Sequence, residues 1–108
     1  MKTIQLMEVQ SYLDTFVGKS CYIHLETTLG AYVNRPIGTF IRNAQVYIER
    51  AQIKGNDSYR VGLKIPIGWV YAEGLNVYDQ DVKGRLLLEG HDEDGKLQVA
   101  LHISLEPL

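Results

Sequence analysis

The stretch "RLLLEGHDEDGKLQVALHI", residues 85–103, decides the fold, because two runs with strand alternation flank one turn. The Asp94-Gly95 pair suits a two-residue type I′ turn, which closes antiparallel hairpins. That turn places Leu88 across from Leu101, and it gathers the aliphatic side chains of both runs on one face. A register one residue away would set charged side chains among these aliphatics. The sequence therefore predicts an antiparallel hairpin with one inward face.

A second hairpin is predicted in "YRVGLKIPIGWVYAEGL", residues 59–75, and two registers are open for it. A three-residue loop over residues 66–68 has proline first and glycine third, as a type I turn with a closing bulge prefers. This loop faces Leu63 with Tyr71. A two-residue loop instead faces Gly62 with Tyr71 and builds a surface of cation–π contacts and an ion pair. Turn chemistry favours the three-residue loop.

Helical spacing of apolar side chains occurs at the start of the chain. It predicts a helix over about residues 4–17, with Thr3 as its N-cap and Gly18 ending it in the left-handed conformation. Further along, residues 39–53 read as one long strand. The alternation of that strand changes phase near Glu49, which predicts a β-bulge.

Successive hairpins make neighbouring strands antiparallel, and sheets of this kind curl until their edges meet. We therefore predict one mainly β domain over residues 1–108. Its N-terminal helix precedes an antiparallel meander of about seven strands, over about residues 20–106, curled into a small, fully or partly closed barrel. A chain of 108 residues buries about two-thirds of its unfolded surface, which suffices for a single core.

Composition and the first residues predict a cytoplasmic protein. The chain is 45% hydrophobic and 22% charged, and no apolar run approaches the ~20 residues of a membrane span. Glu8 stands where a signal peptide would be apolar. Cys21 is the only cysteine, so an internal disulfide and a cysteine-rich zinc site are excluded. Such a lone strand cysteine is typical of a small buried side chain.

Charge is unevenly distributed along the chain, whose net charge is −2. Residues 42–64 hold five basic and two acidic side chains, whereas residues 65–108 hold three basic and eight acidic ones. The net negative charge argues against non-specific binding to nucleic acid, which needs several cations on one face. The central block still allows a local basic patch, and with it a nucleic-acid hypothesis. Its basic residues are Arg42, Arg50, Lys54, Arg60 and Lys64.

His24 and Glu26 lie two residues apart in the strand predicted at residues 21–26, so they share its outward face. Zinc needs at least three protein ligands, and only His91 and His102 remain as nitrogen donors. Nothing in the spacing brings His91 to His24. We therefore expect no metal and no cofactor, and we interpret the pair as the polar face of a sheet.

A small-molecule pocket is the alternative interpretation of these polar faces. In the three-residue register, Glu73 shares a side with Trp69 and Tyr71 and points toward the barrel interior, where a carboxylate must be paired or have a raised pKa. We interpret it as an end-of-strand carboxylate at the barrel rim, and the alternative is an anchor in a small pocket lined by Trp69 and Tyr71. No catalytic triad, phosphate-binding loop or carboxylate pair is found, so no catalytic residue is predicted and an enzyme is disfavoured. The candidate ligand or partner face comprises His24, Glu26, Arg42, Arg60, Trp69, Tyr71 and Glu73.

Four segments, "YIHLETTLGAY", "IRNAQVYIERAQIKG", "YRVGLKIPIGWVYAEGL" and "RLLLEGHDEDGKLQVAL", together resemble the YojF-like proteins of low-GC Gram-positive bacteria. The resemblance covers nearly the whole chain, although the connection from Ala31 to Thr39 is shorter here. It implies a family of unknown function, from which no catalytic residue is carried over. Genes of this family often neighbour a zinc deacetylase of the N-acetylglucosaminyl type linked to bacillithiol synthesis. The resemblance therefore implies an accessory protein with that deacetylase as a partner.

Self-association is also predicted, with a two-fold homodimer as the expected form. The short strand expected over residues 31–34 is a candidate edge for such contacts. The basic centre and the acidic C-terminal hairpins would orient the two copies across the interface.

Overall fold

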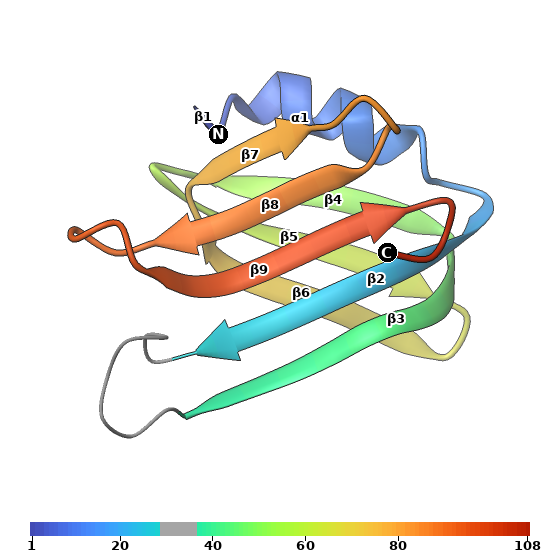
Figure 1. Ribbon diagram of the computed structural model, residues 1–108. Helices are drawn as coiled ribbons and strands as arrows, with labels where there is room; N and C mark the ends of the chain where they lie inside the picture. Colours follow the sequence, from blue (N-terminus) through green and yellow to red (C-terminus); the bar gives the residue numbers. More distant parts are fainter. Residues whose placement is uncertain (29–36) are drawn as a thin grey trace.

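The computed structural model describes residues 1–28 and 37–108 and shows two antiparallel sheets packed face to face (Figure 1). Sheet A has the strand order β1-β7-β8-β9-β2-β3, and sheet B has the order β4-β5-β6. The strands of sheet A are β1 (Lys2–Thr3), β7 (Val77–Gln80), β8 (Leu86–His91), β9 (Leu97–Ser104), β2 (Lys19–Thr28) and β3 (Gly38–Ile48). Those of sheet B are β4 (Arg50–Asn56), β5 (Ser58–Ile65) and β6 (Gly68–Leu75).

The mainly β class and the N-terminal helix are confirmed, but the predicted barrel is wrong. The described residues form nine strands in two separate sheets, and each sheet keeps two edges. The strands also do not follow one another as a simple meander. The last strand, β9, pairs with β2, which lies near the start of the chain. The strand expected over residues 31–34 lies outside the described residues. No described helix is long and apolar enough to cross a membrane.

The core lies between the two sheets and consists of aliphatic side chains from both. Cys21 and Ile23 enter it from β2, as the alternation predicted, and both are buried. Val61 and Leu63 enter it from β5 and are fully buried. Burial raises the pKa of the Cys21 thiol to about 11, because a thiolate would lose its hydration there. The other main core residues are Val9, Leu13, Ile48, Ile53, Leu75, Tyr78, Leu86, Leu88, Leu101 and Ile103.

Helix α1 (Leu6–Asp14) covers one edge of sheet B (Figure 1). Its Gln10 side chain replaces a neighbouring strand, because the Ile53 backbone N–H donates to Gln10 Oε1 at 3.0 Å and Gln10 Nε2 donates to the Ala51 carbonyl at 3.0 Å. The edge groups of β4 are therefore partly satisfied by a side-chain amide, which protects that edge.

The helix is shorter than the predicted span of residues 4–17, and the predicted N-cap is wrong. Thr3 pairs with Val77 in β1, and Gln5 occupies the N-cap position without a side-chain cap. Gly18 does adopt the left-handed conformation, with φ +80°, although turns separate it from the helix end.

The long strand predicted over residues 39–53 is two strands that belong to different sheets. Ile48 ends β3 in sheet A, and Arg50 begins β4 in sheet B. Between them, the Glu49 backbone N–H donates to the Lys64 carbonyl at 2.8 Å. The predicted change of phase is therefore where the chain passes from one sheet to the other. A bulge that was not predicted lies within β3, where Asn43 has φ +57°.

The β8–β9 hairpin has the predicted register but a different turn. Leu88 lies opposite Leu101 as expected. The turn is longer than two residues, because the Asp92 N–H donates to the Lys96 carbonyl at 2.9 Å and Gly95 takes φ +78°. A register shift next to Gly90 absorbs the extra residue and restores the aliphatic face.

The three-residue loop favoured for the β5–β6 hairpin is wrong, and the two-residue alternative is correct. Ile65 pairs with Gly68, and Gly62 pairs with Tyr71. Burial explains the outcome, because this register turns Leu63 toward the core and Tyr71 outward. The stability gained by burying an aliphatic side chain exceeds a preference between turn types.

Candidate functional faces on the two sheets

The predicted site residues divide between the outer faces of the two sheets. His24, Glu26 and Arg42 belong to β2 and β3 of sheet A. The other four belong to β5 and β6 of sheet B: they are Arg60, Trp69, Tyr71 and Glu73. A core lies between these groups, so they do not line one pocket. Two separate faces are therefore the candidates.

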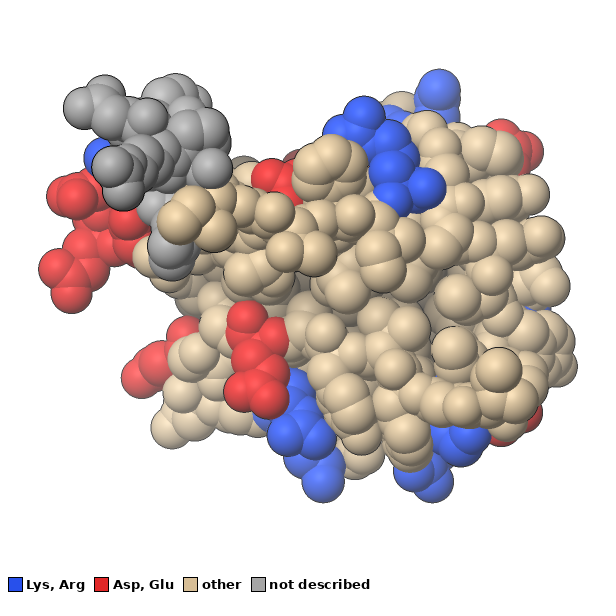
Figure 2. Space-filling view, turned by 90° about the horizontal axis from the view of Figure 1, so that it is seen from below, with Lys and Arg blue, Asp and Glu red and all other residues tan. Residues whose placement is uncertain are grey.

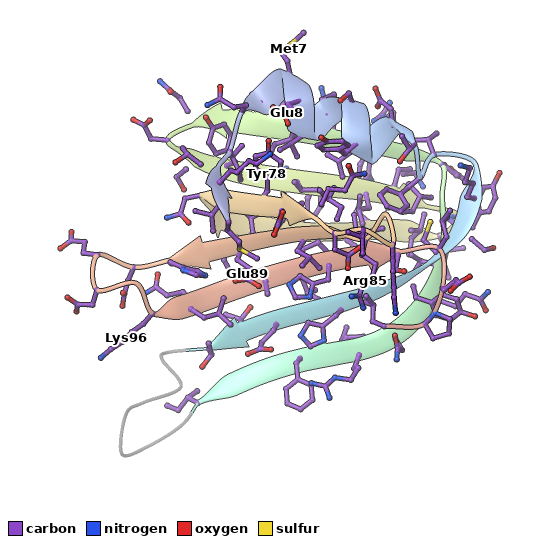
Figure 3. All side chains as sticks on the ribbon, turned by 45° about the horizontal axis from the view of Figure 1, so that its top comes forward. Met7, Glu8, Tyr78, Arg85, Glu89 and Lys96 are labelled. Atoms are coloured by element: carbon purple, nitrogen blue, oxygen red, sulfur yellow. The ribbon has the colours of Figure 1, made fainter. Side chains whose placement is uncertain are left out.

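The histidine face of sheet A contains all three histidines of the chain. Its members are His24 and Glu26 on β2, Glu89 and His91 on β8, and His102 on β9. His24 Nε2 donates to Glu26 Oε1 at 3.0 Å. Glu89 joins the other two, because it accepts from His91 Nε2 at 2.9 Å and from His102 Nε2 at 3.0 Å. Figure 3 shows Glu89 on β8 of the same sheet.

Direct pairing of β2 with β9 builds this face, because it sets His24 opposite His102 with ring centroids 5.4 Å apart. His24 alternates with the buried Cys21 and Ile23, so it lies on the outer face of sheet A, as the alternation predicted. It is nevertheless only 8% exposed, so this part of the polar face has little contact with solvent. Arg42 pairs with His24 from β3 and lines a depression of about 320 Å³ together with His24, His102 and Leu108. Glu26 is paired with His24 and has Phe40, not Arg42, opposite it on β3.

The chemistry of the histidine face is that of imidazoles with a fixed tautomer. An ionised carboxylate only accepts hydrogen bonds, so each Nε2 carries the hydrogen and each Nδ1 is left as the basic nitrogen. Burial lowers the pKa of His102 below its usual range, although the hydrogen bond to Glu89 opposes that effect. Within residues 1–28 and 37–108, no group of three ligating side chains is arranged to hold a metal ion.

Sequence reasoning missed Glu89, His91 and His102 as members of this face. The hairpin register already placed His102 and Glu89 on one outward side of β8 and β9. The missing step was the pairing of β9 with β2, which connects segments about 80 residues apart. No local signal encodes that pairing, and the assumed meander excluded it.

The cationic aromatic face of sheet B is a lattice of outward side chains in three rows. The register sets Arg50, Lys64 and Trp69 in one row. Gln52, Gly62 and Tyr71 form the next row, and Lys54, Arg60 and Glu73 form the last.

Aromatic rings and guanidinium groups contact one another across this lattice. The Trp69 and Tyr71 rings are stacked, with centroids 5.5 Å apart and planes 9° apart. Arg60 Cζ lies 4.5 Å from the Tyr71 ring centroid, and Arg50 Cζ lies 5.3 Å from that of Trp69. Lys64 Nζ lies 5.9 Å from the Trp69 ring. These are cation–π distances, so the rings sit among positive charges while remaining 40% and 45% exposed.

A hollow of about 220 Å³ lies over Gly62 at the centre of the lattice. A Cβ at this position would lie 2.9 Å from Tyr71 Cε1, closer than ordinary contact. The missing side chain therefore lets the Tyr71 ring lie against the backbone of β5 and leaves the hollow open. It is lined by Arg50, Gln52, Lys54, Arg60, Gly62, Trp69 and Tyr71.

Positive charge exceeds negative charge on this face. Arg60 pairs with Glu73 at 3.6 Å and Lys64 with Glu49 at 3.9 Å. Among the described residues, Arg50 and Lys54 form no ion pair. The inward direction that the three-residue register gave Glu73 is wrong, because its side chain is 70% exposed and paired with Arg60 on the outer face of sheet B. The geometry suits a ligand that combines a flat ring with anionic groups.

The predicted basic patch is thus assembled in large part. Four of its five members lie on sheet B, but Arg42 lies on the outer face of sheet A, where its guanidinium is 5.8 Å from the Phe40 ring. The chain passes from sheet A to sheet B between Ile48 and Arg50, which explains why Arg42 is separated from the other four.

Comparisons with known proteins cover nearly the whole chain. A family model described as "Protein of unknown function (DUF1806)" matches residues 3–108. The uncharacterized protein YojF of Bacillus subtilis (strain 168) is 47% identical over 113 residues, which span 99% of this chain and 97% of that protein. The crystal structure of the Bacillus subtilis YojF protein superposes with a TM-score of 0.88 at 46% identity, over 99% of this chain and 95% of that one. The similarity therefore includes both sheets.

Proposed function

The chain belongs to the DUF1806 family of proteins of unknown function, and from its surface chemistry we propose that it is a non-enzymatic protein that binds single-stranded nucleic acid. The binding surface in this proposal is the cationic aromatic face. The observation that carries it is the stacked Trp69–Tyr71 pair beside the hollow over Gly62, which three basic side chains line while Lys64 lies near the Trp69 ring.

Sheet surfaces with exposed aromatic rings bind single strands because bases stack on the rings while basic side chains contact the phosphates. The hollow over Gly62 admits a flat ring next to Tyr71. Gln52 borders that hollow and offers both a donor and an acceptor to a base edge.

The net negative charge of the chain does not exclude nucleic-acid binding by this face, because charge is segregated between the two sheets. The lattice holds four cations and one carboxylate, Glu73. Arg50 and Lys54 form no ion pair in the described part of the chain, so they are the cations available to phosphates without first breaking one. About two phosphate contacts are expected from this count.

A salt titration tests the number of phosphate contacts. For single strands the logarithm of affinity falls with the logarithm of salt concentration with a slope of about −0.7 per contact. Two contacts give a slope of about −1.4, so raising salt from about 50 to about 200 mM lowers affinity about 7-fold. The measurement is fluorescence anisotropy of a labelled oligothymidylate, with quenching of Trp69, the single tryptophan, as a second signal.

Matched variants identify the surface. Tyr71→Ala removes a stacking ring and is expected to weaken binding about 5- to 150-fold, the effect of one base stack. Arg50→Ala is expected to weaken binding and to reduce the salt slope by about 0.7. Lys83→Ala, on an exposed loop of sheet A, is the control and leaves both unchanged. An affinity that does not change with salt concentration would contradict the proposal. A loss of affinity in Lys83→Ala equal to that in Arg50→Ala would also contradict it.

Free nucleotide is the competing source of the same ring-and-phosphate chemistry. Thymidine monophosphate that displaces the oligonucleotide at similar concentration would make the ligand a mononucleotide and contradict the strand proposal. The deacetylase partner and the cytoplasmic location implied earlier stay predictions, and co-purification with that deacetylase is the measurement for the first.

A further inference from the structure

Strand β3 (Gly38–Ile48) is the outermost strand of sheet A, and no described strand lies beyond it. It is 11 residues long and exposes Phe40, Ile41 and Tyr47. Arg42 is the only charged residue within it. Long edge strands with exposed apolar side chains and few charges are templates for pairing with another chain.

The other described edges are short or covered. β1 has two residues, and the edge of β4 is bonded by Gln10 of α1. β6 has eight residues, fewer than β3, and its Gly74 end packs against Gly90 of β8. Figure 2 views the molecule from below Figure 1, the side on which β3 is the lowest strand, and shows a surface on which uncharged residues predominate. β3 is therefore the longest of the described edge strands, and it carries a single charged residue, Arg42.

We propose that β3 pairs antiparallel with β3 of a second copy of this chain, about a two-fold axis, so that the two copies of sheet A become one continuous sheet. An antiparallel edge is self-complementary, since the same backbone donors and acceptors face each other after a two-fold rotation. The edge also supplies apolar side chains on both of its faces, Phe40 and Tyr47 outward and Ile41 inward.

The bulge at Asn43 selects the register of this pairing. Opposite residues in a sheet must point to the same face. Phe40 and Arg42 point outward before the bulge, and Gln45 and Tyr47 point outward after it, because Ile41 and Ala44 face the inward residues of β2. An axis between residues 43 and 44 satisfies this condition for residues 40–42 against residues 45–47, on either side of the bulge.

In that register, Phe40 lies opposite the partner's Tyr47, and Ile41 lies opposite the partner's Val46. Arg42 lies opposite the partner's Gln45, so no like charges meet. An axis at Arg42 would instead place two guanidinium groups face to face, which destabilises a strand pair. Aromatic and aliphatic cross-strand pairs are the contacts that stabilise sheets.

Substitutions at Gln45 test the register through charge. Gln45 is exposed in the monomer, so the folded chain tolerates either change. Gln45→Glu sets a carboxylate opposite the partner's Arg42 and is expected to strengthen dimerisation, whereas Gln45→Arg sets like charges opposite each other and is expected to weaken it. Each dimer contains two such pairs, so the dissociation constant changes about 2- to 30-fold in each direction. Sedimentation equilibrium through the micromolar range measures it.

Cross-linking tests the same register by distance. The double variant Phe40→Cys/Tyr47→Cys brings its two new thiols face to face across the axis, and a short bis-maleimide is expected to join two chains covalently. Each single variant is the matched control, because position 40 is then about 23 Å from position 40 of the partner, seven residues along the strand. Cys21 is buried and does not compete. A monomeric wild type at low and physiological salt, equal shifts by both Gln45 variants, or cross-linking by the single variants overturns the proposal.

Discussion

Gly62 separates the structural and the binding roles of the cationic aromatic face more sharply than any other position. We consider the pair of substitutions Gly62→Ala and Gly62→Val. A new Cβ lies 2.9 Å from Tyr71 Cε1, while ordinary contact begins at 3.4 Å, so the ring moves outward by at least half an ångström. The Tyr71 side chain is 45% exposed, so solvent lies on the side toward which the ring would move. The valine methyl groups additionally fill the hollow of about 220 Å³.

Stability is expected to change little, because two effects oppose each other. Removing glycine from a strand interior stabilises the fold by roughly 0.5–1 kcal/mol. Displacing Tyr71 weakens its contact with Arg60, and an exposed cation–π contact contributes about 0.5–1 kcal/mol. The backbone of Gly62 is not in the left-handed region, so no strain is added. The free energy of unfolding in urea is therefore expected to stay within about 1 kcal/mol of the wild type.

Binding of an oligonucleotide is expected to fall, because a base loses its stacking position beside Tyr71. One base stack corresponds to about 1–3 kcal/mol, or about a 5- to 150-fold weaker affinity, with valine more severe than alanine. Gly68→Ala is the matched control on the same hairpin, since its Cβ meets nothing within 4 Å. Unchanged affinity in both Gly62 variants would refute the role of the hollow. A stability loss above about 2 kcal/mol would show instead that Gly62 is needed for folding.

Three further predictions concern the core and the histidine face. Gly90→Ala places a Cβ 2.0 Å from the Gly74 carbonyl oxygen and 2.6 Å from Val99, so we expect a loss of about 3 kcal/mol or more in urea unfolding; a loss equal to that of Gly68→Ala would contradict the close packing of β6 against β8. Cys21, with a pKa near 11 and no exposure, is expected to react with Ellman's reagent only at the rate of unfolding, and rapid reaction in buffer would contradict its burial. Because the folded pKa of His102 is lowered from 6.5, the unfolded chain binds protons first as pH falls through that value, and stability decreases on acidification. His102→Gln is expected to lose part of that decrease between about pH 7.5 and pH 5.5, and an unchanged pH dependence would count against it.

Local rules predicted the elements whose pattern is strong. The alternation around Leu88 and Leu101 gave the correct register for β8 and β9 even though the turn type was wrong. That outcome is physical, since a slip by one residue would turn every side chain to the other face, while an extra turn residue is absorbed by a bulge. The same argument, applied to Leu63 and Tyr71, would have favoured the two-residue loop, because burial outweighs turn preference there.

Those rules could not predict the pairing of strands that are distant in the sequence. The pairing of β2 with β9 sets His24 beside His102, and neither segment carries a signal for the other. Hydrophobic alternation states only that each strand has an inner and an outer face. It does not state which strands are neighbours, so the histidine face was reduced to its one local pair, His24 and Glu26.

The change of sheet at Glu49 converts an uneven charge along the sequence into a difference between two surfaces. The positive block of residues 42–64 is cut by this change, so that Arg42 stays on sheet A while Arg50 and the basic residues after it line sheet B. The acidic last third supplies β7, β8 and β9 to sheet A. Salt in the solvent largely screens the interaction between exposed charges that lie more than about one Debye length apart. Charges on the two outer faces, with the core between them, therefore influence each other little. A chain with net charge −2 can therefore present a positive surface on one side, and its net charge alone does not predict which ligand that surface binds.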